Sequence, residues 1–208
     1  MSRIALFGGS FNPVHNGHFN LVKETAEKNG IDRVFVIPTF ISPFKKDSGG
    51  FVADGKDRLQ MCRLAFESLP YVTVSDWELS QSEVSYSVNT VSHFHEEFPD
   101  DELFFIMGSD MLLSFDRWHR WKDILGMCTI IAASRENGGS DIEELRKKAG
   151  QLSEYGRVIV TEISAFELSS SEIREKILKN CDLSCYMDKN VVEYIEENHV
   201  YHRLRSKD

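Results

Sequence analysis

Short apolar runs alternate along this chain with longer segments in which apolar residues recur every three or four positions. The short runs are rich in β-branched and aromatic residues, as is typical of buried strands, and they cover residues 4–7, 34–37, 71–74, 103–107, 129–132 and 158–160. The segments with helical spacing cover residues 18–28, 57–67, 88–97, 141–149, 171–178 and 190–197. This alternation predicts an α/β fold, namely a Rossmann-like, doubly wound parallel sheet with helices on both faces.

The length of the chain limits the number of domains that it can form. The chain has 208 residues, of which 41% are hydrophobic, and this is enough for one full core. We expect a single domain over residues 1–208 with a small C-terminal helical portion from about residue 165. The most loop-like segments, 42–55 and 135–140, are expected to be mobile. In such a sheet, ligands bind at the carboxyl ends of the strands, near the point where the strand order reverses.

Residues 8–18, which follow the first predicted strand, read G-G-S-F-N-P-V-H-N-G-H. Paired glycines let backbone N–H groups approach an anion, and a helix that starts near Asn16 adds the positive end of its dipole. His15 and His18 are three residues apart, so on a first helical turn they share a face and can bind one polyphosphate. The segment therefore predicts a phosphate site with the candidate residues Gly8, Gly9, Ser10, Phe11, His15, Gly17 and His18.

Each of these features also has an ordinary explanation. A Gly-Gly pair after a strand often only makes a turn, and H-x-x-H can be a chance pair or part of a metal site. The order of strand, glycines, H-x-G-H and amphipathic helix favours phosphate binding. The segment lacks the Lys-Ser/Thr of a P-loop and the G-x-G-x-x-G of a dinucleotide fold, which argues against a hydride-transferring enzyme.

A second candidate segment, residues 168–174, reads L-S-S-S-E-I-R. Serines that run into a helix place hydroxyl and N–H donors at its N-terminus, and an arginine in the first turn can bind a phosphate through two hydrogen bonds. The alternative is a plain serine cap beside a surface arginine. The candidate residues here are Ser169, Ser170, Ile173 and Arg174.

Two further segments lie between these motifs. Gly108-Ser109-Asp110 follows the fourth predicted strand, where a carboxylate can bind ribose hydroxyls or cap a helix. Trp118-His119-Arg120-Trp121 offers flat faces on which a base or pyridine ring can stack, a contact worth about 1–3 kcal/mol by analogy with base stacking. Tryptophans are more often part of a core, so this segment alone is a weak signal.

With these motifs the chain resembles the H-x-G-H nucleotidyltransferase superfamily and, within it, the bacterial nicotinate-mononucleotide adenylyltransferases. That family carries an I-S-S-T-x-I-R segment late in the chain, a G-x-D segment, an aromatic patch after it, and an S-Y-T-x-D-T-L segment before it. The matching residues here are 168–174, 108–110, 118–121 and 85–90. The resemblance runs nearly end to end and implies one nucleotidyltransferase domain.

The chain departs from the family pattern at three places. A common P-P-H-K stretch is Ser42-Pro43-Phe44-Lys45 here, so only the lysine carries over. Ser87 replaces a threonine and Asn89 an aspartate, which bears on the choice of pyridine substrate. The related nicotinamide-mononucleotide enzymes have a D-x-W-E-like segment that resembles Asp76-Trp77-Glu78.

The resemblance implies transfer of the adenylyl group of ATP to nicotinate mononucleotide, with release of pyrophosphate, in NAD biosynthesis. It implies catalytic roles for His15, His18, Lys45 and Arg174; ATP binding by Gly108, Asp110 and the glycine and serine candidates above; and pyridine-nucleotide binding by Tyr86, Ser87, Trp118 and His119. Mg²⁺ would come with ATP, held by phosphates and water rather than by a protein metal site. A nicotinamide-mononucleotide or dual-specificity enzyme, and a non-catalytic nucleotide sensor, are the alternatives.

The net charge and the cysteine content bear on which partners the protein binds and in which cellular compartment it works. The net charge of −9 argues against a nucleic-acid binder, which would carry a basic stripe. The four cysteines form no C-x-x-C pair, and no apolar run resembles a signal peptide or a membrane span. We expect a cytoplasmic protein with reduced thiols and no membrane partner, and a homo-oligomer remains open.

Overall fold

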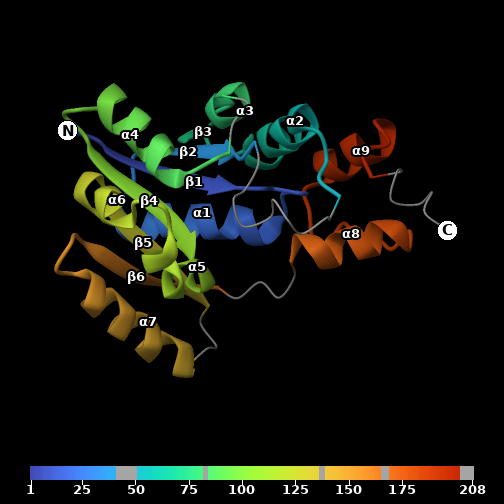
Figure 1. Ribbon diagram of the computed structural model, residues 1–208. Coiled ribbons are helices and arrows are strands. Elements are labelled where there is room, and N and C mark those ends of the chain that lie inside the picture. The colour runs from blue at the N-terminus through green and yellow to red at the C-terminus, as the bar shows by residue number, and fades with distance from the viewer. Residues whose placement is uncertain (41–50, 82–83, 136–138, 165–168, 202–208) are drawn as a thin grey trace.

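The computed structural model describes residues 1–40, 51–81, 84–135, 139–164 and 169–201. Its strands form a six-stranded parallel sheet in the order β3-β2-β1-β4-β5-β6 (Figure 1). The strands are β1 (Arg3–Gly9), β2 (Arg33–Pro38), β3 (Val72–Val74), β4 (Glu102–Gly108), β5 (Thr129–Arg135) and β6 (Val158–Ile163). After β3 the chain crosses back to β4, so the carboxyl ends of β1 and β4 flank the switch point of the sheet.

Helices cover both faces of this sheet, as predicted. They are α1 (Asn16–Asn29), α2 (Gly55–Phe66), α3 (Trp77–Gln81), α4 (Ser87–Glu97), α5 (Ser109–Leu113), the 3₁₀ helix η1 (Phe115–Arg117), α6 (Trp121–Met127), α7 (Gly139–Leu152), α8 (Ser170–Leu178) and α9 (Lys189–Glu197). Alternate residues of β1 enter two separate hydrophobic clusters. Ala5 and Phe7 pack with residues of α1, α2, α8 and α9, whereas Ile4 and Leu6 pack with residues of α4, α5, α6 and α7.

The short helices α3, α5 and α6 were not predicted from the pattern. Each has only five to seven residues, which is too few for apolar positions to repeat on one helical face. Of the expected loop 42–55, residues 42–50 lie outside the described part of the chain, and Gly55 already belongs to α2. The expected loop 135–140 is shorter, because β5 continues to Arg135 and α7 begins at Gly139, with 136–138 outside the described residues.

The C-terminal helices α8 and α9 lie at the end of the molecule opposite to the N-terminus (Figure 1). Their buried residues, Ile173, Ile177, Val191 and Ile195, belong to the same hydrophobic cluster as β1. The C-terminal portion therefore packs onto the core of the sheet. Among the described helices, none has the length and apolar character that crossing a bilayer requires.

Gly156, between α7 and β6, generates a stability prediction. A Cβ atom at this position would lie 2.3 Å from the carbonyl oxygen of Leu125 in α6. The backbone must shift to remove this clash, so Gly156→Ala is expected to lower the free energy of unfolding by about 1–3 kcal/mol in urea denaturation.

Gly150→Ala is the matched control for this change. Gly150 lies in α7 with nothing within 4 Å of its would-be Cβ atom, and alanine is the better helix former by up to about 1 kcal/mol. This variant should be at least as stable as the wild type. A Gly156→Ala variant of undiminished stability would show that α6 shifts at no cost.

Candidate active site

A cavity of about 490 Å³ opens at the carboxyl ends of β1 and β4, where the fold predicts a ligand. Three segments that are distant in sequence meet around it: the loop between β1 and α1, the junction of β4 with α5, and the start of α8. Sequence-predicted site residues that line it are Gly8, Gly9, Ser10, His15, Gly17, His18, Ser87, Gly108, Asp110, Trp118, Ser169 and Ser170. The fold thus brings both predicted phosphate motifs to one cavity.

The two histidines are held together at the start of α1. His15 is the N-cap residue, and its Nδ1 accepts the Gly17 N–H at 3.1 Å. The Nδ1 of His18 accepts the His15 N–H at 3.2 Å, which completes a capping box made from two imidazoles. The ring centroids are 3.8 Å apart. Because each Nδ1 accepts a hydrogen bond, the proton of the neutral ring lies on Nε2, which can then donate to a phosphate oxygen.

The two histidine rings lie next to each other, but the cause differs from the one expected. His15 has an extended backbone (φ −152°) and precedes the helix, so the two rings do not share a helical face. The capping box sets their distance instead. A helix that begins at Asn16 was predicted, and it does.

Gly9 is needed for close packing inside the loop. A Cβ atom there would lie 2.9 Å from the ring of Phe11, which is buried and has a φ of 44°. The Phe11 ring packs edge-on against Phe7 and His18, with centroids 5.4 and 5.1 Å away. Phe11, predicted to bind ATP, is therefore not among the described residues that line the cavity; its ring supports Gly9 and His18 from the core.

Donors from other elements hold the carbonyl groups of the same loop. The Arg58 guanidinium donates to the Ser10 carbonyl at 2.9 Å, and the Ser170 hydroxyl donates to the Pro13 carbonyl at 2.9 Å. Arg174 donates to the Asn12 carbonyl at 2.6 Å. These carbonyl oxygens would repel phosphate oxygens, and each is satisfied by a hydrogen bond to a distant side chain.

The serines at the start of α8 both cap the helix and line the cavity. Ser169 is the N-cap, with its hydroxyl and backbone N–H in a capping box with Glu172, and Ser169, Ser170 and Ser171 all line the cavity. Ile173 is fully buried in the core. Arg174 is not among the described residues that line the cavity; its guanidinium donates to the Asn12 carbonyl and, through its second nitrogen, to the Ser171 hydroxyl at 3.0 Å.

Gly108 and Asp110 border the cavity at the end of β4. Gly108 is the N-cap of α5, and no side-chain bond caps this helix. Asp110 lies in its first turn, with its Oδ1 2.8 Å from the would-be Cβ of Gly108. The carboxylate therefore does not serve as the N-cap, and it lines the cavity as the ribose-binding prediction requires.

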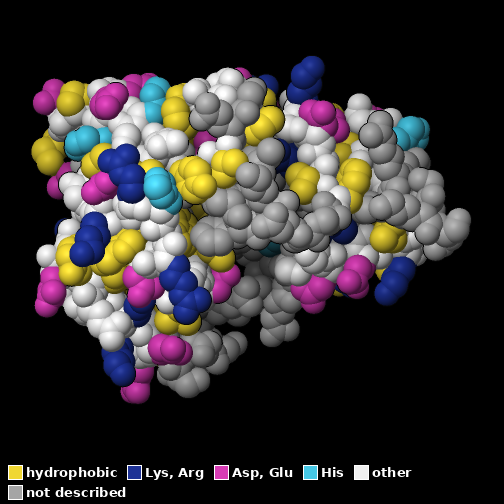
Figure 2. All heavy atoms as spheres, viewed as in Figure 1, with side chains coloured by type: hydrophobic (Ala, Val, Ile, Leu, Met, Phe, Trp, Pro, Cys, Tyr) yellow, Lys and Arg dark blue, Asp and Glu magenta, His cyan; other side chains and the backbone are white. Residues whose placement is uncertain are grey.

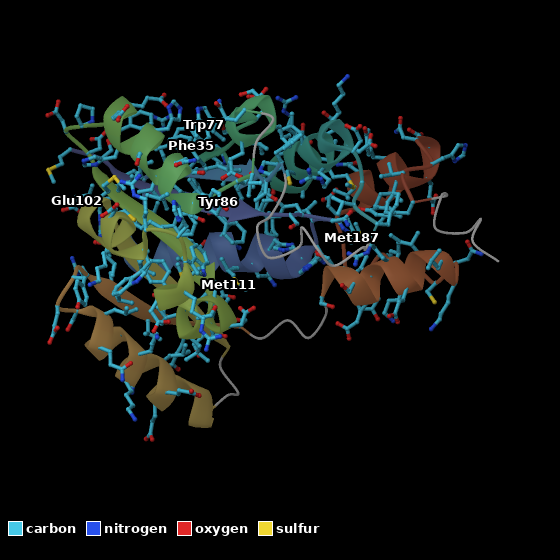
Figure 3. The ribbon with its side chains drawn as sticks, viewed as in Figure 1. Phe35, Trp77, Tyr86, Glu102, Met111 and Met187 are labelled. Carbon is cyan, nitrogen blue, oxygen red and sulfur yellow. The ribbon has the colours of Figure 1, made fainter. Side chains whose placement is uncertain are left out.

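The aromatic candidates lie at two neighbouring cavities. Trp118 lines the cavity and packs against Phe105 and Phe115. Tyr86, which Figure 3 shows near the start of α4, lines a neighbouring cavity of about 400 Å³, and its ring lies 4.8 Å from that of His119. Tyr86 and His119 are not among the described residues of the main cavity, although Ser87 next to Tyr86 is.

Comparison with known proteins agrees with this arrangement. The cytidylyltransferase-like family model matches residues 6–176. The chain belongs to this family. A probable nicotinate-nucleotide adenylyltransferase of Thermotoga sp. is 35% identical over 195 residues, covering 94% of this chain and 95% of its own. One from Bacillus pumilus is 34% identical over 202 residues, covering 97% and 99%.

A solved structure shows the same fold. The Plasmodium falciparum nicotinic acid mononucleotide adenylyltransferase complexed with NaAD has a TM-score of 0.78 and 20% identity, with 97% of this chain and 98% of that chain covered. The resemblance inferred from the motifs is thereby confirmed at the level of the family, and so is the Rossmann-like fold.

Glu78 is a buried residue of the candidate site to which the sequence assigned no role. Glu78 of α3 is buried and lies between the two cavities, lining both. Its Oε1 accepts the Thr90 hydroxyl at 2.5 Å. Burial raises the pKa of Glu78, while hydrogen bonds from Thr90 and Ser85 and the charge of Arg58 act in the opposite direction. The W-E-L segment was visible in the sequence, but a five-residue helix gave no signal of its burial.

Lys45, the remaining catalytic candidate, lies outside the described residues. On the face shown in Figure 2, described acidic side chains are interspersed with basic ones. The positive potential for an anionic ligand must therefore come from local groups, namely the N-termini of α1 and α8 and the side chains around them.

The contacts of Arg174 predict the effect of a conservative change. Arg174→Lys keeps the charge but cannot donate to both the Asn12 carbonyl and the Ser171 hydroxyl from one planar group. We expect kcat for adenylyl transfer to fall about 10-fold or more, because a displaced loop misplaces the reacting groups.

Arg146→Lys is the control, because the interaction of Arg146 among the described residues is an exposed ion pair with Glu162 at 3.6 Å. It should behave as the wild type in the same steady-state assay. Wild-type kinetics for Arg174→Lys would mean that its two hydrogen bonds do not matter to the site.

Proposed function

We propose that this protein transfers the adenylyl group of ATP to nicotinate mononucleotide, forming nicotinate adenine dinucleotide and pyrophosphate. The observation that carries the proposal is the meeting of two helix N-termini, α1 and α8, at one cavity that also holds a histidine pair and Trp118. This arrangement suits a polyphosphate with a flat ring nearby. The names of the relatives support the same reaction.

The reaction would proceed by in-line attack. A phosphate oxygen of the mononucleotide attacks the α-phosphorus of ATP, and the bond to the pyrophosphate oxygen breaks. The nucleophile is already ionised at neutral pH, so catalysis consists of positioning and of stabilising charge on the phosphates. His15 and His18 would donate from one side, and the backbone N–H groups at the N-terminus of α8 from the other, where Ser170 also lines the cavity. We also assign Lys45 and Arg174 to this phosphate site, as predicted.

Mg²⁺ is the divalent cation that we propose for this site. It prefers hard oxygen ligands and keeps several waters, so the ATP phosphates would provide most of its other ligands. The hydroxyl groups of Ser169, Ser170 and Ser171 and the Asp110 carboxylate, which line the cavity, are oxygen groups suited to its bound waters. When bound, it neutralises charge on the phosphates.

The pyridine nucleotide would bind beside Trp118. Its ring would stack on the indole, and the Ser87 hydroxyl could donate to the nicotinate carboxylate from the rim of the same cavity. Tyr86 and His119, whose rings lie together next to this rim, would border the ring at its outer end.

One observation favours the nicotinamide form as the alternative substrate. Glu78 places a carboxyl group at the border of the cavity, where a negative charge would repel nicotinate and accept a hydrogen bond from an amide. Burial raises the pKa of Glu78, which favours its neutral form and reduces this repulsion. We therefore retain nicotinate as the proposed substrate.

We further propose that the enzyme works in the cytoplasm. Cys62 and Cys128 are buried, Cys181 and Cys185 are exposed, and all four are free thiols, as is typical of a reducing compartment.

Pyrophosphate release tests the proposed function directly. Purified protein with ATP, Mg²⁺ and nicotinate mononucleotide should release pyrophosphate and form the dinucleotide. Binding of ATP without release of its pyrophosphate in the presence of either mononucleotide would identify a nucleotide sensor instead.

His18 should act mainly in the transition state. His18→Ala removes one donor aimed at the reacting phosphates, so we expect kcat to fall by about 10²- to 10³-fold with a much smaller change in ATP affinity. His95→Ala, on the exposed side of α4, is the control and should leave kcat unchanged. A His18→Ala enzyme that keeps near-full kcat would remove this residue from the catalytic set.

Substrate choice gives a separate prediction. Nicotinate mononucleotide should be used with a kcat/KM about 10-fold or more above that of the nicotinamide form, because an amide leaves donors of a donor-rich site unpaired. The measurement compares both mononucleotides at fixed ATP and Mg²⁺. Equal values, or a preference for the amide, would refute nicotinate selectivity while leaving adenylyl transfer in place.

A further inference from the structure

Asn12 is a buried polar residue inside the loop that carries His15. Its side chain is only 4% exposed and makes three hydrogen bonds. The amide nitrogen donates to the Phe51 carbonyl at 2.8 Å, and Oδ1 accepts the Ala53 N–H at 3.1 Å. Oδ1 also accepts the hydroxyl of Tyr201 at 3.0 Å. The amide therefore ties the loop to two other parts of the chain.

Tyr201 reaches Asn12 from 189 residues away in sequence. Its side chain is fully buried, and its ring packs edge-on against Phe51 with centroids 5.8 Å apart. Burial raises the pKa of Tyr201 well above its usual range, so the phenol keeps its proton and acts as the donor. It lies beyond residue 176, where the match to the family model ends.

Tyr201 belongs to a group of donors around this loop. The charges of Arg58 and Arg174 both act on its phenol, and these two guanidinium groups hold the carbonyls of Ser10 and Asn12. A backbone anchor follows His15, where the Asn16 N–H donates to the Tyr186 carbonyl at 2.8 Å.

We propose that Tyr201 is a positioning residue for the reaction: its hydroxyl, through Asn12, fixes the loop that places His15 at the phosphate site. Asn12 is three residues from His15, and the intervening Pro13 carbonyl is held by Ser170. A shift at Asn12 is therefore passed to His15 through a short and otherwise anchored segment. The kinetic part of this inference rests on the proposed adenylyl transfer.

The test is Tyr201→Phe with Tyr194→Phe as the matched control. Tyr201→Phe keeps the buried ring and removes only the hydroxyl. Tyr194→Phe likewise removes one hydroxyl from the C-terminal region, where Tyr194 in α9 donates to Asp57 of α2 at 2.9 Å. The two helices lie side by side (Figure 1), and this bond is not made to the loop.

We expect Tyr201→Phe to lower kcat about 10-fold with the KM for ATP within about 2-fold of the wild type, because misplacement acts on the transition state. Tyr194→Phe should keep kcat within about 2-fold at the same temperature, whatever its effect on thermal stability. Asn12→Ala should reduce kcat at least as much as Tyr201→Phe does. The double variant should have a kcat close to that of Asn12→Ala alone, since both changes remove the same hydrogen bond.

Hydrogen exchange provides a readout that does not depend on activity. Amides of residues 10–17 should exchange about 5- to 10-fold faster in Tyr201→Phe than in the wild type, the change expected from loss of one hydrogen bond, and should be unchanged in Tyr194→Phe. Unaltered exchange in Tyr201→Phe, or equal kcat losses in both tyrosine variants, would overturn the proposal. If exchange is faster in Tyr201→Phe than in the wild type, as expected, but the wild type releases no pyrophosphate, the proposed function is refuted and the loop anchor stands.

Discussion

The loop between β1 and α1 has to turn its backbone carbonyls away from an anionic ligand, and the rest of the site depends on how this is achieved. A carbonyl that leaves water needs a donor, because an unsatisfied buried acceptor costs about 1–3 kcal/mol. In this chain the donors are the side chains of Arg58, Ser170 and Arg174. They come from α2 and α8, so the loop takes its shape only when the sheet and the C-terminal helices have assembled.

This requirement explains how the C-terminal portion contributes to the candidate active site. The start of α8 lines the cavity and also anchors the loop, because the Ser170 hydroxyl at this position donates to the Pro13 carbonyl. Beyond α9, the buried Tyr201 binds the Asn12 side chain from the opposite end of the sequence. The C-terminal portion thus supplies both a wall of the cavity and the support for its loop.

The positive potential at the cavity comes from nearby groups and not from the net charge of the protein. The chain carries a net charge of −9, yet the cavity gathers two helix N-termini and the donors of His15 and His18. The buried Glu78 at its border is an exception, and its raised pKa limits the negative charge that it contributes. The balance between these groups bears on the choice between an acid and an amide on the pyridine ring.

The sequence alone determined the parallel sheet and a helix that starts near Asn16, and it singled out the two motifs that meet at the cavity, because strand and helix periods and capping residues are local signals. It could not show that Phe11 packs beneath Gly9, that Arg174 binds the Asn12 carbonyl, or that Tyr86 and His119 lie beside a neighbouring cavity. Nor could it reveal the contact of Tyr201 with Asn12. Those pairings join residues that are far apart along the chain, and only packing on the finished sheet decides which donor meets which acceptor.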